Sequence, residues 1–258
     1  MLTGCQMTDS SLQTPLLFLI FNRPEHTQKV FDINRSFRPS RLFVAADGHS
    51  LYVSNDAGKF AAARMVVKQV DWNSDVRLSI REKNMPTKFA EPEAIKLCFS
   101  YVEKGIIPEN DCLPDPSLYS FSTTLLERYR TDSGVMQINR SNFLREKGFD
   151  LKGSSYSSKL CHPRELATWK IKWSLVDFEL KELDLFISED KFTVLTPKVE
   201  FRNKCFTQLS KTTASKVDRW DFQWYYTGGK LNRLVITSIY CLVSNCGFGI
   251  VAANTNYF

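Results

Sequence analysis

The sequence lacks the short glycine motifs that identify several large enzyme classes. It contains no GxGxxG, no GxxxxGKS/T and no GxSxG, the motifs of dinucleotide-binding folds, P-loop NTPases and serine hydrolases. Its seven cysteines are an odd number without a CxxC pair, and its three histidines share no metal-ligand spacing. Neither a disulfide framework nor a zinc site is therefore indicated, and a reducing cytoplasm is the expected compartment.

Runs of a single charge are also missing. The 34 basic and 28 acidic residues give a formal net charge of +6, but the basic residues are scattered. The Lys/Arg-rich stretches typical of nucleic-acid-binding arms do not occur. A solvated mixed surface is the favoured interpretation, and we expect no nucleic-acid partner.

No apolar segment has the character of a membrane-spanning helix. The first apolar run, residues 16–21, is too short for the core of a signal peptide. Residues 234–258 carry no charge but contain several Asn, Gly and Ser, so we expect a buried strand followed by a loop. A cytoplasmic location follows, with peripheral association at the inner face of the membrane left open.

What the sequence does contain is a regular alternation of strand and helix patterns. Residues 16–21 form an apolar run typical of a strand buried on both faces. A helix pattern follows from Pro24, and residues 41–46 form a second apolar strand. The alternation continues to about residue 140 and predicts an α/β fold with a three-layer, mostly parallel, Rossmann-like sheet.

Polar residues follow each predicted strand at the edge where ligands bind in such sheets. They are Asn22 and Arg23, Asp47 and Gly48, Arg81 to Asn84, and Glu109 to Asp111. Asp47 could accept hydrogen bonds from a nucleobase or a ribose. The guanidinium groups of Arg23 and Arg81 match phosphate oxygens, although a solvated loop end is the alternative for each.

Glu109 and Asp111 flank a single residue, so both carboxylates could reach one point in a tight turn. Hard oxygen ligands of this kind suit Mg²⁺ or Mn²⁺. An ordinary surface turn is the alternative.

The second half of the chain is aromatic and irregular. Trp169 with Trp173, and Trp220 with Trp224, are spaced i, i+4. Core anchors on two helices are the favoured interpretation, and an acceptor platform for a sugar ring is the alternative. Asp221 lies between two aromatic residues, which suits either a general base or a helix-capping aspartate.

Several segments resemble a bacterial family of nucleotide-diphospho-sugar transferases, glycosyltransferases of the GT-A type that are also described as family 2-like or hemolysin-related. They are LLFLIFNRPEHT (16–27), RLFVAADG (41–48), REKN (81–84), GIIPENDCLPDPSLYSF (105–121), ATWKIKW (167–173), RWDFQW (219–224) and LVSNCGFG (242–249). The segments occur in order from about residue 15 to residue 250.

The resemblance implies a GT-A-type sheet with a mixed, aromatic-rich C-terminal extension, and a divalent metal, Mn²⁺ or Mg²⁺. It implies that the nucleotide is held by Phe21, Asn22, Arg23, Asp47, Arg81 and Asn84. Glu109 and Asp111 match the acidic metal motif, and Asp221 matches the Asp of a W-D-x-Q-W segment, where a base role is our inference. Trp169 and Trp220 are the candidate acceptor residues.

The chain also departs from the family pattern. Asn110 replaces the middle acidic residue of an E-D-D motif, and residues 162–166 lack two tryptophans and a glycine expected before ATW. The expected acidic residues and His-Thr pair after Gly249 are missing, with Asn254 where a metal ligand could stand.

The favoured hypothesis is a metal-assisted glycosyltransferase that moves a sugar from a nucleotide-diphosphate donor to a carbohydrate or glycoconjugate acceptor. The alternatives are a degenerate nucleotide-sugar-binding protein without turnover, and a nucleotidyltransferase. We expect residues 1–14 to be a flexible leader and residues 15–258 to form a single domain, with a nucleotide-binding half (15–140) and an acceptor half (141–258).

Overall fold

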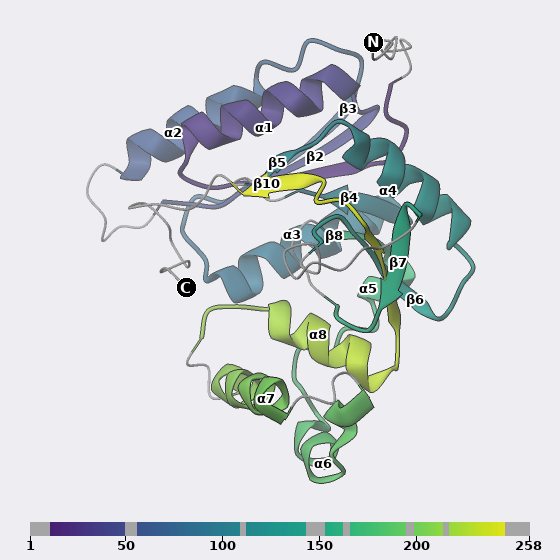
Figure 1. The fold of residues 1–258 in the computed structure, drawn as a ribbon. Helices are drawn as coiled ribbons and strands as arrows, with labels where there is room; N and C mark the ends of the chain where they lie inside the picture. Colours follow the sequence, from purple (N-terminus) through teal and green to yellow (C-terminus); the bar gives the residue numbers. More distant parts are fainter. Residues whose placement is uncertain are drawn as a thin grey trace.

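The first strand determines how the rest of the chain is arranged. In the computed structural model (Figure 1), the described residues are 11–49, 56–108, 112–142, 153–161, 166–194, 199–213 and 217–245. Strand β1 (Leu16–Ile20) is apolar throughout and lies between two parallel neighbours, β2 (Arg41–Ala46) and β4 (Lys104–Ile107). Strand β3 (Asp75–Ile80) extends the sheet in parallel beside β2.

Helices connect these strands as the alternating pattern predicts. They are α1 (Pro24–Phe37), α2 (Asp56–Val67), α3 (Thr87–Tyr101) and α4 (Ser117–Arg128). Helix α1 begins at Pro24, whose fixed φ favours the first helical position. Helix α3 begins at Thr87 and includes Pro92.

Both faces of the central strands are buried, which makes three layers, whereas the edge strand β3 has no fully buried residue. Alternate side chains of a strand point to opposite faces. Accordingly, Phe18 packs in one apolar core with residues of α1, α2 and α4, whereas Leu17 packs in a second core with residues of α3 and the C-terminal helices. The predicted three-layer, Rossmann-like α/β fold is confirmed.

The second half of the chain continues the same sheet with mixed strand directions. Strand β6 (Val135–Asn139) pairs in parallel with β9 (Leu234–Ser238), while β8 (Leu166–Trp169) lies antiparallel between β4 and β6. Strand β7 (Ser155–Ser158) adds an antiparallel edge. The sheet order is β3-β2-β1-β4-β8-β6-β9-β7, and β5 (Cys112–Pro114) forms a separate two-stranded sheet with β10 (Val243–Asn245).

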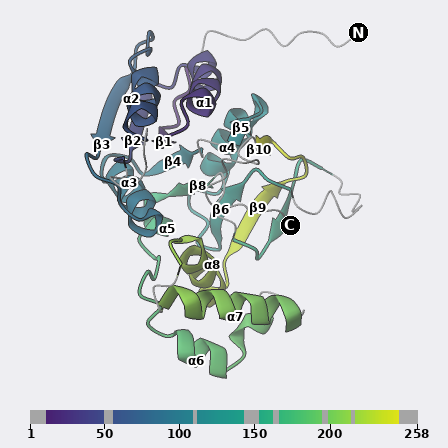
Figure 2. The ribbon, with the colours of Figure 1, turned by 90° about the vertical axis from the view of Figure 1, so that its left-hand side faces the viewer.

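Helix α5 (Lys170–Trp173) follows β8 directly and lies beside α3, whereas three later helices gather at one end of the molecule (Figure 2). These three are α6 (Leu183–Ser188), α7 (Val199–Thr213) and α8 (Asp221–Lys230), with a 3-10 turn at Lys191–Val194. Helix α8 lies nearest to the sheet, and α7 and α6 lie progressively farther from it. No helix within the described ranges is both long and apolar enough to cross a lipid bilayer.

Residues just before Pro15, the expected start of the domain, are bonded to the rest of the fold. The Leu12 amide donates to Phe37 O at 2.9 Å, and the Ser40 amide donates to Leu12 O at 2.9 Å. The hydroxyl groups of Thr14 and Thr123 are hydrogen-bonded at 2.8 Å. Polar composition alone suggested a loose leader up to residue 14, but backbone groups near its end bond to the end of α1.

Replacing Gly228 with alanine is expected to destabilise the protein. An added Cβ at this buried position of α8 would overlap Cys161 Sγ and lie 3.4 Å from Met136 Sδ. Overpacking of this kind typically costs about 1–3 kcal/mol, which chemical denaturation would measure. Gly58→Ala in α2 is the control because its added Cβ meets nothing within 4 Å; stability there should be unchanged or raised by up to about 1 kcal/mol. Equal stability of the two variants would contradict this packing.

Candidate functional site

The carboxyl ends of β1, β2 and β3 lie side by side. Ala46 is in register with both Ile20 and Ile80, the last residues of the neighbouring strands. The next residues continue this alignment, since the Asp47 amide donates to Ile20 O at 3.3 Å and the Arg81 amide donates to Ala46 O at 3.0 Å. The polar residues predicted after these strands therefore share one edge of the sheet.

Asp47 is at the centre of this edge. Asn84 Nδ2 donates to Asp47 Oδ2 at 2.9 Å, and the Met85 amide lies 3.3 Å from each carboxylate oxygen. Burial raises the pKa of the half-buried Asp47 carboxyl; nearby amide donors and the charges of Arg81 and Arg64 lower it, but only in part. The structure thus keeps a partly desolvated carboxylate where the parallel strands end.

Gly48 allows the loops after β2 and β3 to come together. A Cβ at this position would overlap the backbone of Lys83. The next residue, His49, forms a parallel bridge with Lys83. This close approach is compatible only with glycine, and it positions Asn84 beside Asp47.

Two arginines lie behind the edge. Arg64 Nη2, from α2, donates to Asp47 O at 2.9 Å and also to Arg81 O. Arg81 Nη2 donates to Ala90 O at 3.2 Å and to Glu93 Oε2 at 3.0 Å. Arg81 is thus at the predicted edge, but its guanidinium is held by α3. Arg64 was not predicted; its position in the last turn of a helix leading to β3 was the only sequence signal.

The segment after β1 lies at the same edge. The Phe21 ring packs edge-to-face on Phe60 of α2, with ring centroids 5.1 Å apart. Arg23 precedes the first residue of α1, and its carbonyl oxygen accepts the Thr27 amide at 2.9 Å. The N-terminus of the 14-residue helix α1 therefore opens beside Asn22 and Arg23. The helix dipole favours negative charge there, and Glu25 in the first turn supplies one such charge.

A distant loop supplies the cap of α3. Pro86 precedes this helix and forms no side-chain cap bond. Instead, Asp218 accepts the amides of Thr87 and Lys88, both at 2.9 Å. Trp220 Nε1 donates to Glu91 Oε2 at 2.6 Å. These bonds bring the RWDFQW segment close to the loop that carries Asn84, a contact that the sequence did not predict.

Asp221 begins α8 and pairs with Arg219. Arg219 Nη2 lies 2.6 Å from Asp221 Oδ2, and Nε lies 3.2 Å from Oδ1. The Asp221 side chain is 23% exposed. The carboxylate is therefore partly exposed while Arg219 pairs with both of its oxygens. Its position in the first helical turn also suits the macrodipole of α8.

The tryptophans lie in the two cores. Trp169 is 3% exposed and donates to Leu126 O at 3.1 Å, and Trp220 is 6% exposed. Trp173 packs on Trp220 and Trp224, with ring centroids 5.4 Å and 5.6 Å apart. Burial thus supports the core-anchor interpretation, because neither Trp169 nor Trp220 presents an open ring face for a sugar. Trp169 also ends a strand, so the two pairs do not lie on two similar helices.

The candidate metal residues Glu109 and Asp111 lie outside the described residues. Strand β4 runs parallel to β1 and ends at Ile107, one residue after Ile106, which is in register with Leu16, and β5 begins at Cys112. Among the residues whose positions are described, no three His, Cys, Asp or Glu side chains gather as a metal site.

Replacing Asp47 with asparagine is expected to stabilise the unliganded protein near neutral pH. The pKa of Asp47 is higher in the folded state than in the unfolded state. Its contribution to the free energy of unfolding is therefore favourable below the unfolded pKa and is lost as the pH rises through the folded pKa. Asn has the same shape without the charge. We expect the Tm of Asp47→Asn to rise by about 1–2 °C near neutral pH and to match that of the unsubstituted protein in acid.

Thermal denaturation followed by circular dichroism over a pH series measures this difference. Asp32→Asn is the control because Asp32 is exposed on α1. A similar gain in both variants, or a loss for Asp47→Asn alone, would contradict the assigned effect of burial.

Comparisons with known proteins give no family. No protein-family model matches the chain, and no curated protein matches it. Solved structures with a similar fold include UDP-glucose pyrophosphorylase in complex with UDP-glucose, with a TM-score of 0.41 and 12% identity over 88% of this chain and 90% of the other. Another is the inositol-1-phosphate CTP transferase from T. maritima, with a TM-score of 0.33 and 12% identity over 64% and 74% of the two chains. At these values, neither similarity indicates what this chain binds.

Proposed function

We propose that this protein binds a nucleotide-diphosphate sugar at the carboxyl edge of β1, β2 and β3. The observation that carries the proposal is the half-buried Asp47 carboxylate, which Asn84 and the Met85 amide hold at this edge. A carboxylate that is kept partly desolvated at a strand end suits a ligand that donates hydrogen bonds to it. Ribose hydroxyls and nucleobase N–H groups are such donors.

The surroundings of Asp47 suit the rest of a nucleotide. The N-terminus of α1 opens at the same edge and favours phosphate. Phe21 is partly exposed at this edge and offers apolar surface to a base. Arg23 is the cation we assign to the diphosphate. Arg81 has a structural role in this proposal, because its guanidinium already donates hydrogen bonds to Glu93 and to Ala90 O.

The metal in this proposal is Mg²⁺ or Mn²⁺ on Glu109 and Asp111. The basis is the resemblance noted in the sequence and the preference of these ions for carboxylate oxygens. Such an ion stabilises the negative charge that develops on a departing nucleoside diphosphate.

Within this proposal, the sugar is transferred to a carbohydrate or glycoconjugate acceptor. The acceptor hydroxyl oxygen forms a bond to the anomeric carbon, the bond from that carbon to the diphosphate breaks, and the nucleoside diphosphate leaves. Asp221 is the base that takes the hydroxyl proton, because its carboxylate is partly exposed and lies on a segment that the hydrogen bonds of Asp218 hold next to the Asn84 loop. Nucleotidyl transfer and binding without turnover are the alternatives.

Binding of a nucleotide sugar is expected to depend on Asp47. We expect at least one of the UDP-, GDP- or CDP-sugars to raise the Tm, and calorimetry to give a Kd for it. Losing a hydrogen bond to a charged group costs about 1.5–3 kcal/mol, so Asp47→Asn should weaken binding about 10- to 100-fold although its fold is retained.

Asp32→Asn is the matched control and should bind like the unsubstituted protein. Asp111→Ala should remove only the part of the affinity that depends on added Mn²⁺. If no nucleotide sugar binds with Mn²⁺ present, the proposed function is wrong; if Asp47→Asn binds normally, the site is elsewhere.

The products distinguish glycosyl transfer from its alternatives. We expect release of a nucleoside diphosphate from the bound donor, with Asp221→Asn lowering the rate by about 10²- to 10⁴-fold at unchanged donor affinity. Chromatography of the reaction mixture measures this. Formation of a nucleoside triphosphate from donor and pyrophosphate would instead establish nucleotidyl transfer, and binding without any product would establish a binding protein.

A further inference from the structure

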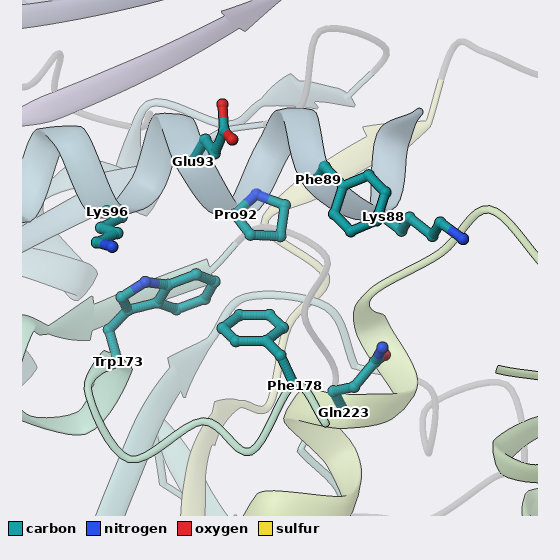
Figure 3. Close-up of a pocket in the computed structure, with 8 residues that line it drawn as sticks. All are labelled: Lys88, Phe89, Pro92, Glu93, Lys96, Trp173, Phe178 and Gln223. Carbon is teal, nitrogen blue, oxygen red and sulfur yellow. The ribbon is translucent and has the colours of Figure 1, made fainter. Parts of the chain in front are cut away.

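A second candidate site lies on the outer face of α3, away from the sheet. Figure 3 shows an open groove between this helix and the segments that carry Trp173, Phe178 and Gln223. Its volume is about 250 Å³, and its α3 wall consists of Lys88, Phe89, Pro92, Glu93 and Lys96. The volume is below that of most drug-sized pockets, so the groove suits a small ligand of about one ring.

The Gln223 amide at the groove has an unused hydrogen-bonding group. Gln223 is only 6% exposed, and its Oε1 is buried with no hydrogen-bond partner in the part of the chain described. Buried polar groups are nearly always hydrogen-bonded, so an unpartnered one at a cavity points to a ligand. A half-turn of the terminal amide exchanges Oε1 and Nε2. A ligand hydroxyl suits either orientation because it can both donate and accept.

The walls of the groove are aromatic. Phe89 is 53% exposed and Phe178 is 39% exposed, so their rings remain open to a ligand. Phe178 packs edge-to-face on Trp173, with ring centroids 5.7 Å apart. In Figure 3, Phe89 and Phe178 lie on opposite walls. Aromatic rings in these arrangements favour a flat aromatic partner.

The charge of the groove is positive. Lys88 and Lys96 lie along the α3 wall, and the Lys88 ammonium lies 5.1 Å from the centre of the Phe89 ring. Glu93 is the acidic residue of the lining, but Arg81 pairs with it at 3.0 Å. The two lysines therefore leave a net positive charge that favours an acid.

We propose that this groove binds a small aromatic acid that carries a ring hydroxyl. The ring packs against Phe89 and Phe178, the hydroxyl bonds to the Gln223 amide, and the acid group lies near Lys88 or Lys96. This site is separate from the Asp47 edge and does not depend on the nucleotide-sugar proposal.

The probe is 4-hydroxyphenylacetate, with binding to the full chain measured by calorimetry and ligand-observed NMR. Phenylacetate lacks the hydroxyl, and 4-hydroxyphenylethanol lacks the acid. We expect each of these two compounds to bind about three- to tenfold more weakly than the probe, the loss typical of one neutral hydrogen bond or one exposed charge contact.

Gln223→Leu should weaken binding of 4-hydroxyphenylacetate by the same factor. This variant should then bind 4-hydroxyphenylacetate no more tightly than phenylacetate. Its Tm should be unchanged or higher, because the buried oxygen has no partner to lose. The double variant Lys88→Met, Lys96→Met should lose the preference over 4-hydroxyphenylethanol, while the exposed Lys68→Met on the opposite side of the sheet is the matched control.

Failure of the probe to bind at millimolar concentration would overturn the proposal. So would equal binding of all three compounds, or binding that Gln223→Leu leaves unchanged. A nucleotide-sugar titration of Gln223→Leu keeps the two proposals distinguishable, since donor affinity at Asp47 should not change.

Discussion

Burial of both faces of the central strands is the constraint on which this structure depends. Strands β1 and β2 are apolar at nearly every position, so they require helices on both sides, and alternate side chains enter two separate cores. No polar group can lie along such strands without a buried partner. Polar chemistry is therefore restricted to the strand ends, which is where Asp47 lies.

The carboxyl edge of β1, β2 and β3, where Asp47 lies, combines close backbone packing with an electrostatic cost to stability. Gly48 lets two loops meet, and their meeting holds Asn84 and the Met85 amide on the carboxylate. Burial still raises the pKa of Asp47, so the unliganded protein keeps a charge at the expense of stability. Binding sites often carry such a cost, because a ligand completes the interactions that the free protein lacks.

Helix α3 connects the two candidate sites. Its N-terminus receives a cap from Asp218, and its outer face forms one wall of the aromatic groove. The Arg81–Glu93 pair lies between them, with the arginine at the sheet edge and the glutamate at the groove. A ligand that changed the position of Glu93 would therefore act on a residue that supports the nucleotide edge.

The sequence by itself determined the alternating elements, the two-faced sheet and the edge at which Asp47, Arg81 and Asn84 meet, because these depend on local periodicity and on strand direction. It could not determine contacts between segments far apart in the chain. The antiparallel insertion of β8, the capping of α3 by Asp218 and the burial of Trp169 all arise from long-range packing. Only the tertiary structure could bring Gln223 opposite α3, since a polar residue within a helix gives no local sign of whether its amide finds a partner.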